Sequence, residues 1–104
     1  MELEDLDRVV QSVGSKNFLK YFDLFWDNYM IRSNSVFREA FKDEPWTESS
    51  KNTIISKGKA IFKSGLVAEV LDDLSKSTDT AISAKATETL KRYLRACEKI
   101  EDYL

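Results

Sequence analysis

"NFLKYFDLFWDNY", residues 17–29, is the stretch that decides the fold of this chain of 104 residues. Its aromatic residues recur at steps of three and four, which places them on one face of a helix. They are Phe18, Tyr21, Phe22, Phe25, Trp26 and Tyr29. Aromatic side chains also form base-stacking surfaces, but at strict helical spacing such a stripe is more typical of a buried core. We therefore predict a helix, capped by Ser15, whose aromatic face is buried.

Apolar residues at helical spacing predict further helices on both sides of this stretch. Gly14 and Gly65 are typical helix stops, and Pro45 disfavours helix at the residue before it. The predicted helices lie at about residues 3–13, 15–29, 34–43, 48–64, 66–74 and 78–104. We expect an all-α fold, a compact bundle of five to six helices in a single domain, 1–104, with a longer C-terminal helix.

The composition excludes several classes of function. The chain has no His, and its single Cys97 cannot form an internal disulfide or a multi-thiolate zinc site. No nucleophile with an adjacent base is evident. We therefore predict a protein that is not an enzyme and binds no metal or cofactor. An acidic start, "MELEDLDRVV", and the lack of a long apolar run favour a cytoplasmic protein without a membrane segment.

Charge is unevenly distributed along the chain. The net charge is −2. Residues 1–46 carry six bases and nine acids, and residues 65–104 carry six bases and eight acids. Residues 47–64 carry four lysines and one acid. A basic segment in an acidic protein is a candidate contact surface for a polyanion.

The basic segment forms an amphipathic helix on a helical wheel. Its apolar face consists of Ile54, Ile55, Gly58, Ile61 and Phe62. The opposite face carries small residues, most of them polar, and a lysine: Ser49, Asn52, Thr53, Ser56, Ala60 and Lys63. Lys57 and Lys59 lie on its flanks. Small polar side chains can approach a DNA groove closely, and lysines beside them can contact phosphates. The alternative is a solvated helix whose serines serve only as caps.

The order of elements adds a second signal. A helix at about 34–43, a break at Pro45 and a capped start at Thr47 give a helix-turn-helix-like unit at about 34–64. Within it, "SSKNTIISKGKAIFKSG", residues 49–65, resembles over residues 50–62 the recognition helix in the fourth region of bacterial sigma factors. Lys51 stands where that family has a buried valine, and Gly58 where it has an alanine. The resemblance implies a helix-turn-helix regulator of transcription.

These features predict a small sequence-reading DNA-binding protein with helix 48–64 in the major groove of double-stranded DNA. The predicted contacts are Ser49, Asn52, Thr53, Ser56, Lys57, Lys59 and Lys63. Because one such helix makes few contacts, we expect a homodimer. The helix at 78–104 offers a seam of near-heptad spacing for it, through Leu90, Tyr93, Cys97, Ile100 and Leu104.

The acidic overall charge also favours a different class of function. A helical protein–protein interaction module, such as an adaptor, an inhibitor or a subunit of a complex, would bind a protein partner and no nucleic acid. Cys97 is interpreted as a small buried residue, since it lies on an apolar seam and no basic partner for its thiol is evident.

Overall fold

The computed structural model describes residues 3–102, with side chains for residues 8–98. Within this range every regular element is an α-helix, which confirms the predicted all-α fold. The chain divides into two compact units, Met1–Gly65 and Leu66–Leu104. The division falls at Gly65, which follows the end of a long helix. The φ of Gly65 is 75°, which confirms the predicted helix stop.

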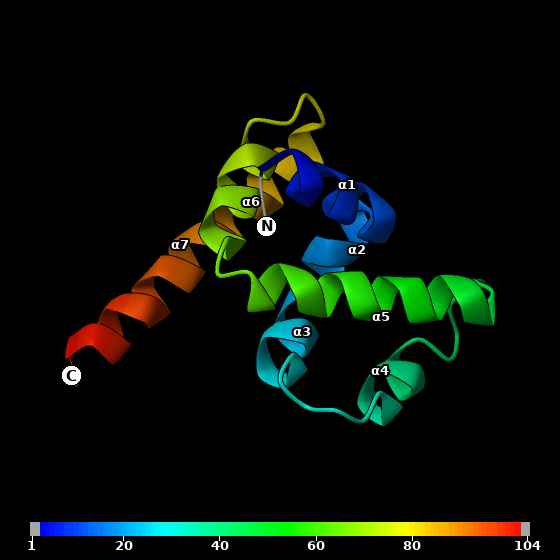
Figure 1. Ribbon diagram of the computed structural model, residues 1–104. Helices are drawn as coiled ribbons and strands as arrows, with labels where there is room; N and C mark the ends of the chain where they lie inside the picture. Colours follow the sequence, from blue (N-terminus) through cyan, green and yellow to red (C-terminus); the bar gives the residue numbers. More distant parts are fainter. Residues whose placement is uncertain (1–2, 103–104) are drawn as a thin grey trace. The chain divides into compact units, whose positions relative to one another are not determined.

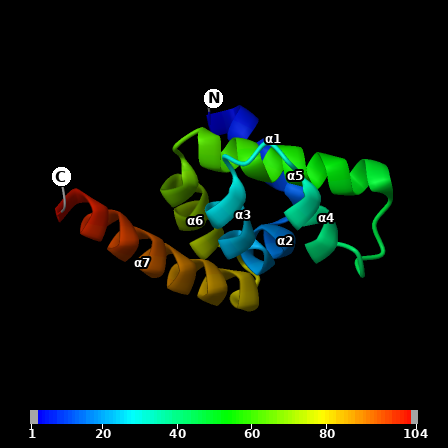
Figure 2. The same ribbon diagram turned by 90° about the horizontal axis from the view of Figure 1, so that it is seen from below.

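The first unit contains five helices (Figure 1). They are α1 (Leu3–Val13), α2 (Ser15–Lys20), α3 (Phe22–Asn28), α4 (Ser35–Ala40) and α5 (Glu48–Lys63). Gly14 ends α1 with a φ of 90°, as the sequence predicts. Figures 1 and 2 show α1 on one side of α5, and α3 and α4 on the opposite side. Helix α5 is therefore the element around which the first unit is built.

Aromatic side chains fill the core of this unit. Phe18, Phe22 and Phe25 of the predicted stripe are buried, whereas Tyr21, Trp26 and Tyr29 are half-buried. The rings of Phe18 and Phe22 both lie about 5–6 Å from that of Phe62 on α5. Aromatic pairs at this separation add to the stabilisation gained from burial. The interpretation of the stripe as core is thus confirmed.

The helix predicted for residues 15–29 is broken at Tyr21, which has φ −106° and ψ 18°. Its N-terminal cap is also not as predicted, because Gly14 takes that position and no side chain caps α2. The Tyr21 ring packs edge-on against Phe41 and Trp46. These partners lie far along the chain, so the local pattern does not contain the cause of the break.

Glu44 links both Tyr21 and Lys20 of α2 to the connection that follows α4. The Tyr21 hydroxyl donates a hydrogen bond to Glu44 Oε1, and Lys20 Nζ lies 2.7 Å from the same oxygen. The hydrogen bonds from Lys20 and Tyr21 lower the pKa of Glu44. The pair with Glu44 raises the pKa of Lys20 in turn. This contact holds the segment that leads into α5.

The second unit consists of α6 (Val67–Ser75) and α7 (Thr80–Asp102), which pack on each other. Asp79 begins α7, because its Oδ1 accepts hydrogen bonds from the backbone N–H groups of Ala81 and Ile82. Ala86 and Thr89 on α7 are buried. The sequence predicted helices at both places, and both are confirmed.

Candidate nucleic-acid interface

Local sequence signals determine where α5 begins and ends. Thr47 has an extended backbone, and its Oγ1 accepts a hydrogen bond from Ser50 N at 3.1 Å. This is the N-cap that the sequence predicts. The helix then runs without interruption to Lys63, and Gly65 follows. The 16 residues of α5 correspond to a length of about 24 Å.

One face of α5 is buried in the first unit. Ile54, Ile55, Gly58, Ile61 and Phe62 are all buried, which confirms the predicted apolar face. Gly58 lies directly against Phe25 of α3. A Cβ atom built on Gly58 would stand 2.3 Å from Cε1 of that ring. Only a glycine allows α5 to lie this close to α3.

The opposite face of α5 is exposed. The exposed members of the predicted DNA-binding set are Ser49, Asn52, Thr53, Ser56, Lys57 and Lys63. All six come from one unbroken helix, so they lie along a single ridge. We refer to these six residues as the α5 ridge.

Two side chains of the α5 ridge already have partners within the protein. Asn52 Oδ1 accepts a hydrogen bond from Arg38 Nη2 at 3.0 Å, which leaves its amide nitrogen as a donor. Thr53 Oγ1 donates to Ser49 O at 3.1 Å, so its free lone pairs can only accept. A two-bond contact of Asn52 with adenine would use the second lone pair of the amide oxygen, because Arg38 already donates to the first.

Lys59 is not part of this surface, and the prediction that it contacts phosphate is wrong. Only 8% of the residue is exposed. Its ammonium donates to Ile31 O and Asn34 Oδ1, both at 2.7 Å, and lies 5.2 Å from the Phe37 ring centre. Burial lowers the pKa of Lys59, and the charge of Lys63 lowers it further. Lys59 therefore links α5 to the connection between α3 and α4 through these two hydrogen bonds.

The single acid of α5 is compensated by two bases. Glu48 lies 3.5 Å from Arg38 Nη1 and 3.8 Å from Lys51 Nζ. The Lys51 side chain is only 12% exposed, so its stem lies along the protein, and its ammonium lies beside the exposed carboxylate of Glu48. Among the residues whose side chains are described, no carboxylate pairs with Lys57 or Lys63. The α5 ridge is therefore electropositive.

A hollow of about 350 Å³ borders the ridge on the side of α1. Ser49 and Thr53 form one of its walls, and Gln11, Asn17 and Trp46 contribute to the rest. No charged side chain lines it. The hollow supplies hydrogen-bonding groups beside the ridge.

The connection between α4 and α5 differs from the tight turn that the sequence suggests. It runs from Phe41 to Thr47, whereas the turn of a helix-turn-helix has three to four residues. Phe41 is fully buried, and its ring lies 5.1 Å from that of Trp46. The connection is longer because it contributes to the core.

The sequence-based prediction assigned no role to one basic residue beside α5 and to one set of basic residues on α7. Arg38 was not assigned a role, yet it contacts both Glu48 and Asn52 at the α5 ridge. The second group lies on α7, where Lys91, Arg92 and Arg95 line a hollow of about 450 Å³. The charge count over residues 65–104 concealed this group among acids. A window of one or two helical turns would have found it.

The described residues contain no cluster of three His, Cys, Asp or Glu side chains that could hold a metal ion. No described helix has the length and apolar character needed to cross a bilayer. Cys97 is a free, half-buried cysteine. Comparison of the chain with protein-family models, curated proteins and solved structures gave no match. The functional argument therefore depends on the surfaces described above.

Proposed function

We propose that this protein is a small DNA-binding protein that inserts α5 into the major groove and regulates transcription in the cytoplasm. One observation carries the proposal: six polar and basic side chains stand exposed along one uninterrupted helix. A major groove about 12 Å wide admits an α-helix. The small side chains of Ser49 and Ser56 let the helix backbone approach the bases closely.

The groups on the α5 ridge have separate roles in this proposal. The Asn52 amide nitrogen and the Ser56 hydroxyl read base edges, because both are exposed and can form hydrogen bonds there. Lys57 and Lys63 contact phosphates on the flanks of the groove. Arg38, whose side chain is 53% exposed, adds positive charge at the edge of the ridge. Lys59 has no part in binding.

A homodimer completes the proposal, because one helix alone supplies few contacts. Leu90, Tyr93 and Cys97 of the predicted seam are half-buried, and the neighbouring Leu94 is 45% exposed. The remaining two residues of the predicted seam, Ile100 and Leu104, lie outside the described side chains. Replacing Leu94 by Asp should convert a dimer to a monomer in sedimentation equilibrium, and a wild-type monomer would reject the dimer.

Selection from a random duplex library, followed by fluorescence anisotropy at about 50 mM salt, tests the proposal. The variant Lys57→Gln with Lys63→Gln should reduce the slope of log K against log salt by about 1.8, since each phosphate contact contributes about 0.9. The matched control changes two exposed lysines of the same unit, Lys16 and Lys42, to Gln. Asn52→Ala should alter the selected sequence.

Two results would overturn the proposal. One is the absence of wild-type binding to any duplex at about 50 mM salt. The other is an affinity and salt slope for the Lys57 and Lys63 variant that equal those of the lysine control. In either case the α5 ridge is a solvated surface.

A second candidate function, binding of a protein partner without nucleic acid, is favoured by one observation. Met30 is 72% exposed and Ile31 is 47% exposed in the connection between α3 and α4, and Val36 is exposed at the start of α4. Contiguous exposed apolar patches often mark protein contact sites, and Met30 and Ile31 are adjacent in the sequence. A stoichiometric partner that is lost with Met30→Asp but retained with the Lys57 and Lys63 variant would support this candidate instead.

A further inference from the structure

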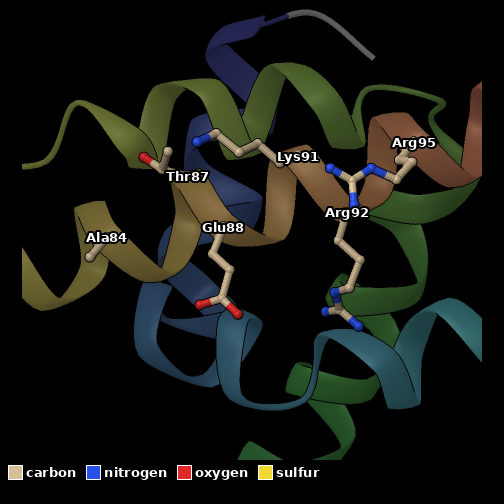
Figure 3. A pocket seen from close by; sticks show the side chains of 6 residues that line it. All are labelled: Ala84, Thr87, Glu88, Lys91, Arg92 and Arg95. Carbon is tan, nitrogen blue, oxygen red and sulfur yellow. The ribbon is translucent and has the colours of Figure 1, made fainter.

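The second unit carries a basic surface on α7. Lys91, Arg92 and Arg95 are exposed, and together with Ala84, Thr87 and Glu88 they line the hollow of about 450 Å³. Figure 3 shows these side chains along one stretch of α7, with the Glu88 carboxylate pointing away from the Lys91 ammonium. Three cations and one carboxylate leave this surface with a net charge of +2.

The spacing of these residues separates them from the packed face of α7. At 100° per residue, Lys91, Arg92 and Arg95 fall within about one third of the helix circumference. The buried residues Ala86 and Thr89 fall on the other side. The basic residues are therefore not needed to hold α7 against α6.

Ion pairing among the described side chains does not account for the charges of Lys91 and Arg95 either. Lys20, Arg38 and Lys42 in the first unit each lie within 4 Å of a carboxylate. By contrast, no carboxylate among the described side chains pairs with Lys91 or Arg95. Two unneutralised cations within about one turn, next to a third, raise the local potential for an anion.

The identity of the residues indicates the chemistry of the ligand. A guanidinium group presents a planar fork of donors that matches phosphate oxygens, and two arginines lie here at positions i and i+3. The residues that line the hollow extend from Ala84 to Arg95 along α7, and its volume is larger than a single phosphate needs, so it suits a continuous sugar–phosphate backbone.

We propose that Lys91, Arg92 and Arg95 on α7 form a second DNA contact, which binds the phosphate backbone without reading the sequence. This inference rests on the proposed function of α5. Phosphates occur all along a duplex, so the contact strengthens binding to every sequence equally. Glu88 opposes this contact, because its carboxylate repels phosphate.

The test compares variants of the full chain by fluorescence anisotropy on the selected duplex and on a scrambled duplex. Lys91→Gln with Arg92→Gln and Arg95→Gln should lower affinity for both duplexes at least about tenfold and reduce the salt slope by about 2.7. The ratio of the two affinities should stay unchanged. Glu88→Gln should raise both affinities by about two- to fivefold.

The matched control removes three exposed lysines elsewhere, Lys16, Lys42 and Lys76, for the same change in net charge. Far-ultraviolet circular dichroism checks that each variant keeps its helices. If the α7 variant binds like this control while the wild type binds DNA, the inference is overturned and the role of α5 stands. If α7 variants lose binding to an acidic peptide but not to DNA, the surface contacts protein and the inference is again overturned. Wild-type protein that binds no DNA overturns the proposed function, and the inference with it.

Discussion

Substitution of Gly58 by Ala tests the packing that holds α5 in place. The new methyl group would stand 2.3, 2.4 and 2.8 Å from three atoms of the Phe25 ring. Carbon atoms in favourable contact are about 3.5–4.0 Å apart, so the ring or the helix has to move by about 1 Å. Phe25 is fully buried, with Phe37 and Phe41 as ring neighbours, and has little room to move.

The expected loss of stability follows from two opposing effects. Inserting a methylene-sized group into a filled core costs about 1–3 kcal/mol, and the short distances favour the upper end. Alanine is a better helix former than glycine, and this difference offsets about 1 kcal/mol of the packing cost. We therefore expect the free energy of unfolding to fall by about 2 kcal/mol, or about 30-fold in the folding equilibrium.

Urea denaturation followed by tryptophan fluorescence measures this loss, because Trp26 and Trp46 both lie in the unit that contains Gly58. Ser56→Ala, on the exposed face of the same helix, is the control and should be neutral or slightly stabilising. Phe25→Leu, which shortens the opposing side chain, should recover at least about 1 kcal/mol of the Gly58→Ala loss in a double-mutant cycle. The packing argument is refuted if Gly58→Ala is as stable as the Ser56→Ala control.

Lys59→Met should lower the free energy of unfolding by about 1–3 kcal/mol, because two acceptors lose their donor, and should leave the salt slope of DNA binding unchanged. Urea denaturation measures the stability and fluorescence anisotropy measures the salt slope. A reduced slope would show that Lys59 contacts DNA. Glu44→Gln should be less stable than the wild type at neutral pH. Because the folded pKa of Glu44 lies below its ordinary value of 4.5, its contribution is present above about pH 4.5 and is lost as the pH falls through the folded pKa. Denaturation at several pH values should therefore show the two proteins converging in acid, and a constant difference would contradict the role of the Lys20 and Tyr21 contacts.

Most of the helices could be predicted because their signals are local. Gly14 and Gly65 adopt the positive φ that ends a helix, and the Thr47 side chain caps a residue three positions away. The apolar face of α5 follows from its own periodicity. The position of the α5 ridge on that helix follows as well, because its polar residues lie opposite the apolar face on the helical wheel.

Non-local contacts explain where the prediction failed. Lys59 looks like a flanking cation in the sequence, but its ammonium bonds to groups 25 and 28 residues away. The break at Tyr21 coincides with a contact to Glu44, 23 residues away. No pattern within one helix contains these partners.

The sequence by itself determined the helical class, most helix ends and the exposed face of α5, because each depends on backbone preferences and spacing within a few residues. The tertiary structure alone decided that Lys59 is buried, that Phe41–Thr47 enters the core and that the chain divides at Gly65. Those outcomes depend on which side chains meet after the helices have packed, and that is a property of the assembled core.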